Sequence, residues 1–182
     1  MAFATLYRFR IDVSDVDRGV YEALDFRAAL HPSEVPIYLV TRVLAFALNT
    51  QEGLEFSPGG LSDPDAPAIK VDDPQGGVRL WIEIGNPSAR KLHKAAKASR
   101  EVRVYTYKDP AHILKDIAQE KVHEAERLQI FSFSQGFLDR LVLGLEKDNA
   151  WTLLSSEGSL VVSYGRDEVA QSELISHPVS SS

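Results

Sequence analysis

The sequence predicts a mixed α/β fold, and three observations lead to this class. Apolar and polar residues alternate near both ends of the chain, which is the pattern of strands. Between these ends, strand-like runs alternate with segments whose apolar residues recur at helical spacing. The 182 residues suit one globular domain, and no linker divides them. We therefore expect residues 1–182 to form a single domain, a mixed β-sheet flanked by helices with a hairpin near each end.

The first hairpin is predicted to pair residues 4–13 with residues 20–29 around a polar turn that ends in Gly19. Residues 166–182 are polar and rich in serine, and we expect a loosely ordered tail there. The remaining elements expected between these ends are a helix to about residue 49, a strand at 68–71, a strand at 78–84, a helix at 87–99, a strand at 102–107, a helix at 110–119, a strand at 128–133, a helix from Ser134 to about residue 143, and a hairpin of 150–155 with 160–164.

The helix that ends near Asn49 has start signals of its own. Ser33 is its expected N-cap, and Glu34 lies against its positive end. Pro36 falls in the first turn, where a helix tolerates proline. Because the helix is apolar nearly all round, with Arg42 as the one charge along its length, we expect it to be buried against the sheet.

Composition excludes several classes of function. The absence of cysteine excludes disulfides, zinc–thiolate sites and cysteine nucleophiles, and it fits a reducing cytoplasm. No run approaches eighteen apolar residues and the first ten residues lack the apolar block of a signal peptide, so we expect a cytoplasmic protein without a membrane span. The five histidines are scattered, which argues against a histidine metal site. The net charge of −6 means that any nucleic-acid contact must come from a local patch.

The strand expected at residues 78–84 carries a carboxylate in its middle. Trp81 and Glu83 fall on one face, and the apolar residues that alternate with them fall on the other. Because both faces are bulky, the strand should be central and covered on both sides. An unpaired carboxylate is costly to bury, so Glu83 should face a polar cavity, a cation or a metal. A structural ion pair with Arg42 or with a helix lysine is the simpler alternative.

A basic helix is expected directly after this strand, over residues 87–99. Arg90, Lys94 and Lys97 share one face, opposite an apolar seam, and Lys91 lies at the border of that seam. A charged face of this kind is usually only solvated. It is nevertheless the concentrated cationic patch of the sequence, so a phosphate backbone would meet it first.

Residues 57–77 are rich in proline, glycine and aspartate and predict a long loop, a feature that is more often functional or mobile than incidental. Asp63 and Asp65 in this loop are ordinary turn residues when taken alone. Metal-dependent hydrolysis of a phosphodiester, however, needs carboxylates from separate segments and a cation near the attacking water. The loop aspartates, the strand residue Glu83 and the basic helix together supply these groups.

Three motifs resemble the YaeQ family of bacterial proteins: His31-Pro32-Ser33-Glu34, the strand Leu80-Trp81-Ile82-Glu83-Ile84-Gly85 and the strand end Thr106-Tyr107. The resemblance runs over nearly the whole chain. It implies a variant of the PD-(D/E)XK nuclease fold, which is restriction-endonuclease-like. The family has no established biochemical activity, so the resemblance says more about the fold than about the function.

The nuclease pattern, carried over to this chain, implies acidic metal ligands from three segments: Asp65 after Pro64, Glu83, and Glu34 on the first core helix. The pattern also expects a lysine two residues after the strand carboxylate, where this chain has Gly85. In such folds a lysine of the following helix can replace it, which would be Lys94 or, second, Lys91. Glycine leaves room for such a group to approach the backbone closely.

Two hypotheses follow. The first is a Mg²⁺- or Mn²⁺-dependent nuclease or related phosphodiesterase, in which Lys94 orients the nucleophile and Arg90, Lys91 and Lys97 contact nucleic acid. The second is a nuclease-fold protein that does not cut and serves as a binding or scaffold module. Gly85 and the acidic net charge favour the second, whereas the four site-type residues together favour the first. The sequence leaves the substrate, DNA or RNA, and the oligomeric state open.

Overall fold

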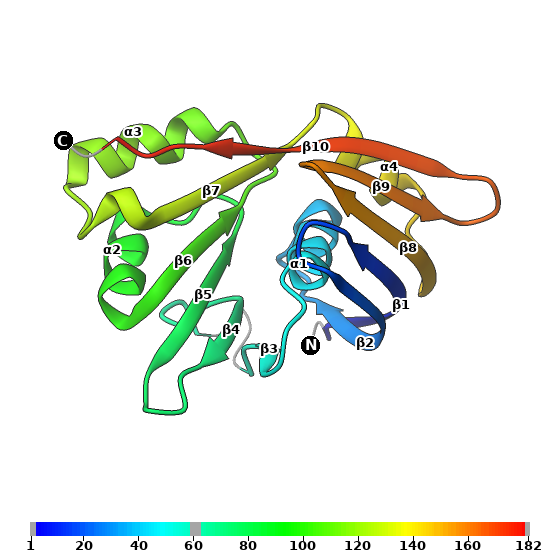
Figure 1. Ribbon diagram of the computed structural model, residues 1–182, viewed down its shortest axis with the longest axis horizontal. Coiled ribbons are helices and arrows are strands. Elements are labelled where there is room, and N and C mark those ends of the chain that lie inside the picture. The colour runs from blue at the N-terminus through cyan, green and yellow to red at the C-terminus, as the bar shows by residue number, and fades with distance from the viewer. Residues whose placement is uncertain (1–2, 59–62, 181–182) are drawn as a thin grey trace. The chain divides into compact units, whose positions relative to one another are not determined.

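The structure, a computed structural model, describes residues 3–58 and 63–180, and the chain divides into two compact units (Figure 1). Unit 1 comprises Met1–Thr50 and Phe133–Ile175, and unit 2 comprises Gln51–Ser132 and Ser176–Ser182. Strands and helices occur in both units, so the predicted mixed α/β class is confirmed. That the two units behave as the single domain expected from the sequence stays a prediction.

Unit 1 contains a mixed sheet with the strand order β2-β1-β8-β9-β10. Its strands are β1 (Thr5–Asp15), β2 (Val20–Leu30), β8 (Asp148–Ser156), β9 (Ser159–Tyr164) and β10 (Val169–His177, whose last two residues belong to unit 2). β1 pairs antiparallel with β2 and parallel with β8, and β8, β9 and β10 follow one another antiparallel. Both predicted hairpins, β1–β2 and β8–β9, are therefore present.

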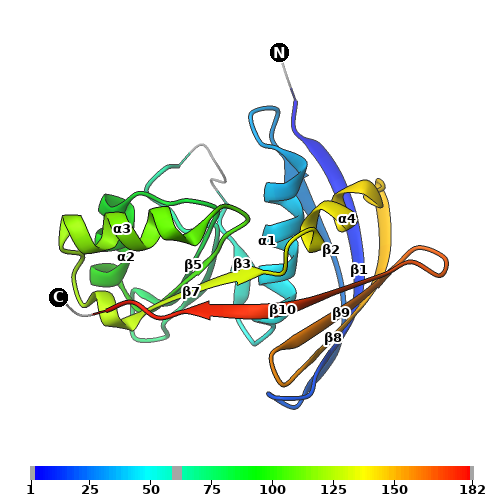
Figure 2. The same ribbon diagram turned by 90° about the horizontal axis from the view of Figure 1, so that it is seen from above.

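Two helices, α1 (Pro36–Leu48) and α4 (Phe137–Leu143), pack against each other in unit 1 (Figure 2). α1 also packs on β1 and β2 and is buried along most of its length, as its apolar sequence predicts. Alternation along β1 buries Phe9 and Ile11 on the helix-covered side, while Arg8 faces the other side. One face of the sheet therefore builds the core and the other carries charges.

In unit 2 the strand order is β7-β6-β5-β4-β3, and the strands are again mixed in direction. Its strands are β3 (Leu54–Phe56), β4 (Ile69–Asp72), β5 (Val78–Ile84), β6 (Ser99–Tyr105) and β7 (Leu128–Phe133), and its helices are α2 (Ala89–Ala98), α3 (Pro110–Glu120) and the short 3₁₀-helix η2 (Ala125–Arg127). β5, β6 and β7 are parallel, and an apolar core joins them to α2 and α3. The three-residue β3 was not predicted, and residues 59–62 of the predicted loop lie outside the described residues. Among the described helices of both units, none is long and apolar enough to cross a membrane.

The prediction that Ser33 caps the first helix is wrong. The N-cap of α1 is Val35, whose backbone is extended, with φ −94° and ψ 150°. Pro36 follows at the first helical position, and the residue before a proline is forced out of the helical region. The Ser33 hydroxyl instead lies 2.7 Å from Nδ1 of His31, within the turn that precedes the helix.

The expected cap of α4 is wrong for a similar reason. Ser134 was expected to cap it, but the N-cap is Gly136 in the left-handed region, with φ +82°. The Ser134 hydroxyl is used elsewhere, because its Oγ accepts a hydrogen bond from the backbone N–H of Glu173 at 2.9 Å.

The loosely ordered tail expected at residues 166–182 is also a wrong prediction over most of its length. β10 occupies Val169–His177 and pairs antiparallel with β9. The residues of β10 that are buried are small, Ala170 and Ser172, so the strand carries little apolar signal in the sequence. His177, at its end, lies with Nε2 2.7 Å from Oγ of Ser132.

Candidate functional site

The candidate site is centred on Glu83 in unit 2. β5 lies between β4 and β6 and is covered on both faces, so the predicted central strand is confirmed. Only 5% of the Glu83 side chain is exposed. Its Oε1 accepts a hydrogen bond from Nε1 of Trp81 at 2.7 Å, and its Oε2 lies 3.2 Å from Nζ of Lys91. Glu83 therefore faces a cation and a polar donor, as its burial requires.

Local structure explains how these groups meet. Trp81 and Glu83 lie two residues apart, so both point to the face of β5 that α2 covers. The side chain of Ser88 caps α2 by accepting a hydrogen bond from the backbone N–H of Lys91 at 3.1 Å. This cap fixes Lys91 in the first turn of α2, from where its partly exposed side chain reaches the carboxylate.

Two opposing effects act on the pKa of Glu83. Burial raises it above its ordinary value, because the charged form loses its hydration. The charge of Lys91 and the hydrogen bonds from Trp81 and Lys91 lower it, but the effect of burial is larger. Glu83 is therefore a carboxyl group that ionises less readily than an exposed one.

A second carboxylate–lysine pair joins the same helix to the loop before β4. Oδ1 of Asp65 is 3.2 Å from Nζ of Lys94, and 71% of the aspartate side chain is exposed. The backbone N–H of Asp65 donates to Oδ1 of Asp63 at 3.0 Å, so Asp63 holds the turn, as its simpler interpretation predicts. An exposed pair of this kind contributes about 0–1 kcal/mol to stability.

Lys91 and Lys94 lie three residues apart and so share one face of α2. The structure thereby brings four groups to that face, which we call the carboxylate–lysine cluster: Asp65, Glu83, Lys91 and Lys94. The sequence left the choice between the two lysines open. In the structure Lys91 contacts Glu83 and Lys94 contacts Asp65.

The rest of the predicted basic face is confirmed in part. Arg90 and Lys97 are exposed on α2, opposite its buried apolar seam. Beyond the helix the patch is neutralised, because Arg100 pairs with Asp73 at 2.8 Å and Arg103 pairs with Glu101 at 2.8 Å. The exposed cations that remain of this predicted patch therefore lie on α2.

Glu34, the remaining predicted metal ligand, belongs to unit 1. Its Oε1 accepts a hydrogen bond from the backbone N–H of His31 at 3.1 Å, so the carboxylate closes the turn before α1. Its other oxygen is buried and has no hydrogen-bond partner among the described residues. The role of Glu34 as a metal ligand stays a prediction.

Tyr107 is a residue near the site to which the sequence patterns gave no role. Gly85 follows β5 with φ +87°, and a Cβ on it would lie 3.3 Å from Cε1 of Tyr107. The group that approaches this glycine closely is thus a tyrosine ring. The strand end Thr106-Tyr107 was part of the family resemblance, but nothing in its pattern indicated this contact.

The donor set fits Mg²⁺ in kind, although both carboxylates are already paired. Mg²⁺ is usually held by one or two protein carboxylates and keeps several waters, and Asp65 and Glu83 supply two. Among the described residues no group of three or more histidine, aspartate or glutamate side chains is placed to hold a metal. An ion would have to displace Lys91 from Glu83 and Lys94 from Asp65. Water would therefore complete most of its coordination.

Fold and site together define a mixed α/β protein with a carboxylate buried in a central strand and held by a lysine of the next helix. The family model described as "YaeQ protein" matches residues 1–172 of this chain. The chain therefore belongs to the YaeQ family, and the resemblance noted in its sequence is confirmed.

Individual relatives agree with this assignment. "Uncharacterized protein YaeQ" of Escherichia coli strain K12 is 34% identical over 108 residues, 59% of this chain and 59% of that protein. Its namesake in Salmonella typhi is 28% identical over 167 residues, 91% and 92% of the two chains. The crystal structure of the YaeQ protein from Xanthomonas axonopodis pv. citri has a TM-score of 0.87 at 27% identity, covering 98% of this chain and 100% of that one. That of the Pseudomonas syringae protein has a TM-score of 0.86 at 28% identity, with 95% of each chain covered.

Proposed function

We propose that the protein is a Mg²⁺- or Mn²⁺-dependent nuclease or related phosphodiesterase on a variant of the restriction-endonuclease-like PD-(D/E)XK fold. The observation that carries this proposal is the carboxylate–lysine cluster. A buried strand carboxylate, Glu83, and a loop carboxylate, Asp65, reach neighbouring lysines on one helix face. Burying a carboxylate in an apolar strand costs free energy, and a catalytic role would explain why the chain keeps a carboxylate there.

Each member of the cluster has a separate role in this proposal. Glu83 and Asp65 would hold the ion, which when bound supplies an acidified water and offsets charge on the phosphate. Lys91 takes the place of the strand lysine that is missing at Gly85, because it is the helix lysine in contact with Glu83. Lys94, on Asp65, is the second candidate for that role.

Nucleic acid is the proposed substrate class. Arg90 and Lys97 are exposed on α2, the helix that also carries both lysines of the cluster. A phosphate backbone is attracted to such a local cationic face even when the whole protein is acidic. Cytoplasmic location, expected from the composition, fits this substrate and stays a prediction.

Calorimetric titration of Mg²⁺ and Mn²⁺ tests the proposal. The wild type should bind the ions saturably, whereas Glu83→Gln should not, with its far-UV circular dichroism unchanged. The matched control is Glu101→Gln, which removes an exposed carboxylate outside the cluster and should leave binding intact. If the wild type shows no saturable binding of either ion, the proposal is overturned.

Turnover is tested separately with the lysines. Lys91→Ala should keep metal binding and abolish cleavage of single- and double-stranded DNA and RNA. Lys97→Ala, on the same helix but outside the cluster, should weaken substrate binding without abolishing cleavage. Loss of metal binding in Lys91→Ala would contradict the role given to Lys91.

A second candidate function is a nuclease-fold binding or scaffold module that does not cut. Two observations favour it: both oxygens of Glu83 are already engaged, and a tyrosine ring lies against Gly85, where the nuclease pattern expects a lysine. Under this alternative, Lys91 and Glu83 form a structural ion pair. Wild-type protein would then bind neither ion, and Lys91→Ala would lower the melting temperature without changing any metal affinity.

A further inference from the structure

β2 lies at one edge of the sheet of unit 1. It pairs with β1 along its whole length without a register break, and no described strand lies on its other side. Natural edge strands are usually protected by proline, by charged side chains and lysine above all, or by a β-bulge. β2 has no proline, lysine or bulge, and its charges are Glu22, Asp25 and Arg27. The edge of this eleven-residue strand is a template for pairing with another chain, although at Ala29 the backbone carbonyl already accepts a hydrogen bond from the Arg42 side chain.

The backbone groups that face this open edge can be identified. The N–H of Arg8 in β1 donates to the carbonyl of Lys147 at 2.8 Å, so the backbone of Arg8 points toward β8. Its register partner in β2, Arg27, therefore turns its N–H and carbonyl away from β1. The same holds for every second residue, and the carbonyl of Ala29 accordingly accepts a hydrogen bond from the Arg42 side chain.

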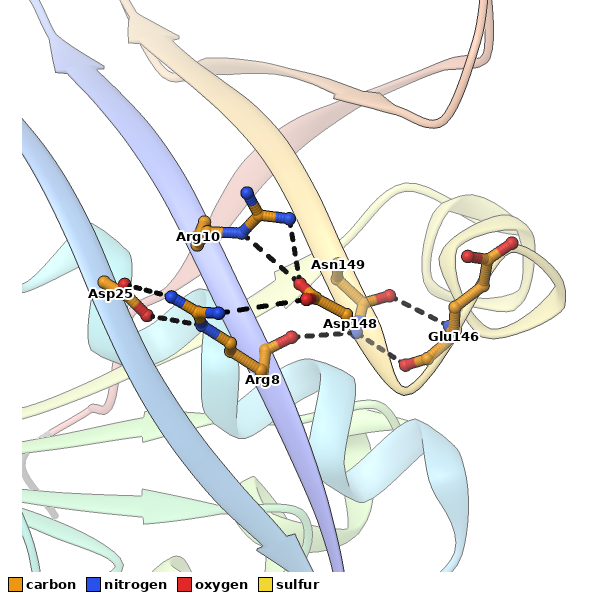
Figure 3. Close-up of polar contacts among 6 residues, drawn as sticks. All are labelled: Arg8, Arg10, Asp25, Glu146, Asp148 and Asn149. Atoms are coloured by element: carbon orange, nitrogen blue, oxygen red, sulfur yellow. Dashed lines mark hydrogen bonds and ion pairs between the residues drawn. The ribbon is translucent and has the colours of Figure 1, made fainter.

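Two of these residues of β2, Asp25 and Arg27, carry charges on the solvent face of the sheet. Figure 3 shows Arg8 reaching Asp25 of β2, with hydrogen bonds of 3.0 and 2.7 Å, and Arg10 reaching Asp148 of β8. Asp25 and Arg27 lie two residues apart in β2, both exposed and both with backbone groups on the open edge. A negative and a positive side chain thus stand next to each other along that edge.

This order of charges makes β2 complementary to a second copy of itself. When two β2 strands run antiparallel about an axis through Phe26, Asp25 of each copy lies directly opposite Arg27 of the other. A register centred on Asp25 would set the two aspartates against each other, and one centred on Leu24 would pair neither charge with its opposite. Directly opposed charges of opposite sign stabilise a strand pair by about 0.2–1 kcal/mol each.

Phe26, on the inner face, fits the same axis. Its ring lies between those of Phe9 and Phe46, with centroids 5.8 and 4.9 Å away, and it is only half-buried. An open hollow of about 530 Å³ beside it is lined by Arg8, Asp25, Phe26 and Arg27. In the register centred on Phe26 the two phenylalanines lie opposite each other, and each would cover the exposed part of the other's ring.

We propose that β2 is a self-association edge, and that two copies of this chain pair through it antiparallel about a two-fold axis at Phe26. Each Asp25 then exchanges both backbone hydrogen bonds with Arg27 of the other copy. The interface is isologous, as two-fold symmetry requires. It is formed by unit 1 alone and does not depend on the function proposed above.

Cysteine cross-linking tests the register, because the natural chain has no cysteine. In the proposed pairing Ala23 of one copy lies opposite Ala29 of the other, at a Cα distance of about 5.5 Å that a disulfide spans. A mixture of Ala23→Cys and Ala29→Cys proteins should give a covalent dimer on mild oxidation, and neither protein should do so alone. Thr152→Cys, exposed on β8 away from the edge, is the control and should not cross-link in any mixture. Failure of the mixture to cross-link would overturn the proposal.

Charge exchange tests the pairing energy. Sedimentation velocity should show a concentration-dependent dimer for the wild type, and Asp25→Arg or Arg27→Asp alone should raise its dissociation constant roughly tenfold or more. The double exchange restores opposite charges across the axis and should recover the dimer. Circular dichroism of each variant verifies that the monomer folds. A wild type that stays monomeric, or folded single variants that dimerise as tightly as the wild type, would contradict the proposal.

Discussion

Glu83 shows how one buried charge couples stability to chemistry. Its carboxylate is held by Trp81 and Lys91, and burial still raises its pKa. The position of this charge was predictable, because alternation in β5 placed a carboxylate on a covered face. Which lysine pairs with Glu83 was not predictable. Lys91 and Lys94 lie only one turn of α2 apart, and which of them reaches the carboxylate depends on how the helix packs on β5.

The raised pKa predicts how stability depends on pH. Above the ordinary value of 4.5, the folded protein holds the Glu83 proton more tightly than the unfolded chain does. By linkage, the contribution of Glu83 to the free energy of unfolding falls as pH rises from 4.5 through the raised pKa. Glu83→Gln cannot ionise, so its stability relative to wild type should increase over that interval. The increase is about 1.4 kcal/mol for every tenfold difference between the acid dissociation constants of Glu83 in the folded and unfolded states.

Urea unfolding from about pH 4 to pH 8 measures this difference. A Glu83→Gln difference that stays flat with pH would show that burial does not dominate the titration of Glu83.

At the scale of elements, strands with strong apolar alternation were predicted well. The predicted bounds of β5 and β7 are those of the structure. β1 differs by one residue at its start and two at its end, and β2 differs by one residue at its end. The starts of α1 and α4 and the last strand were not predicted well, whereas α3 begins at Pro110 as predicted. Serine hydroxyls that looked like caps are engaged in tertiary contacts or turns, as Ser134 is, and β10 buries side chains too small to give a strand signal.

Helix caps give a matched pair of predictions. Ser88→Ala removes the side chain that caps α2 and should destabilise the protein by about 1 kcal/mol. It should also loosen Lys91, whose backbone N–H is the donor to this cap. Ser33→Ala removes a serine that precedes α1 without capping it, and the change should stay within about 0.5 kcal/mol.

Thermal unfolding followed by circular dichroism compares the two variants. An effect of Ser33→Ala as large as that of Ser88→Ala would contradict the assignment of Val35 as the N-cap of α1.

At the scale of the whole molecule, the two tryptophans report on the two units separately. Trp151 is buried in unit 1 and Trp81 is buried in unit 2, and the chain has no others. We expect the single domain predicted from the sequence to unfold in one transition, because β7 and β10 each contribute residues to both units. In Trp81→Phe the remaining fluorescence follows unit 1, and in Trp151→Phe it follows unit 2.

Within each variant, the fluorescence midpoint in urea should coincide with the midpoint by far-UV circular dichroism. Because both midpoints are measured on the same variant, any loss of stability caused by the substitution itself does not affect their comparison. Midpoints that separate in either variant would instead identify two domains that unfold independently.

The discontinuity of unit 1 has a consequence for synthesis on the ribosome. The N-terminal hairpin and α1 emerge first, but β8, the parallel neighbour of β1, is translated only after nearly all of unit 2. At ordinary elongation rates this delay is on the order of ten seconds. Unit 2, which is nearly continuous in sequence, can therefore fold first. Until β8 is made, the nascent hairpin has two unpaired strand edges and an apolar face that is not fully covered. During this period a chaperone would protect the chain.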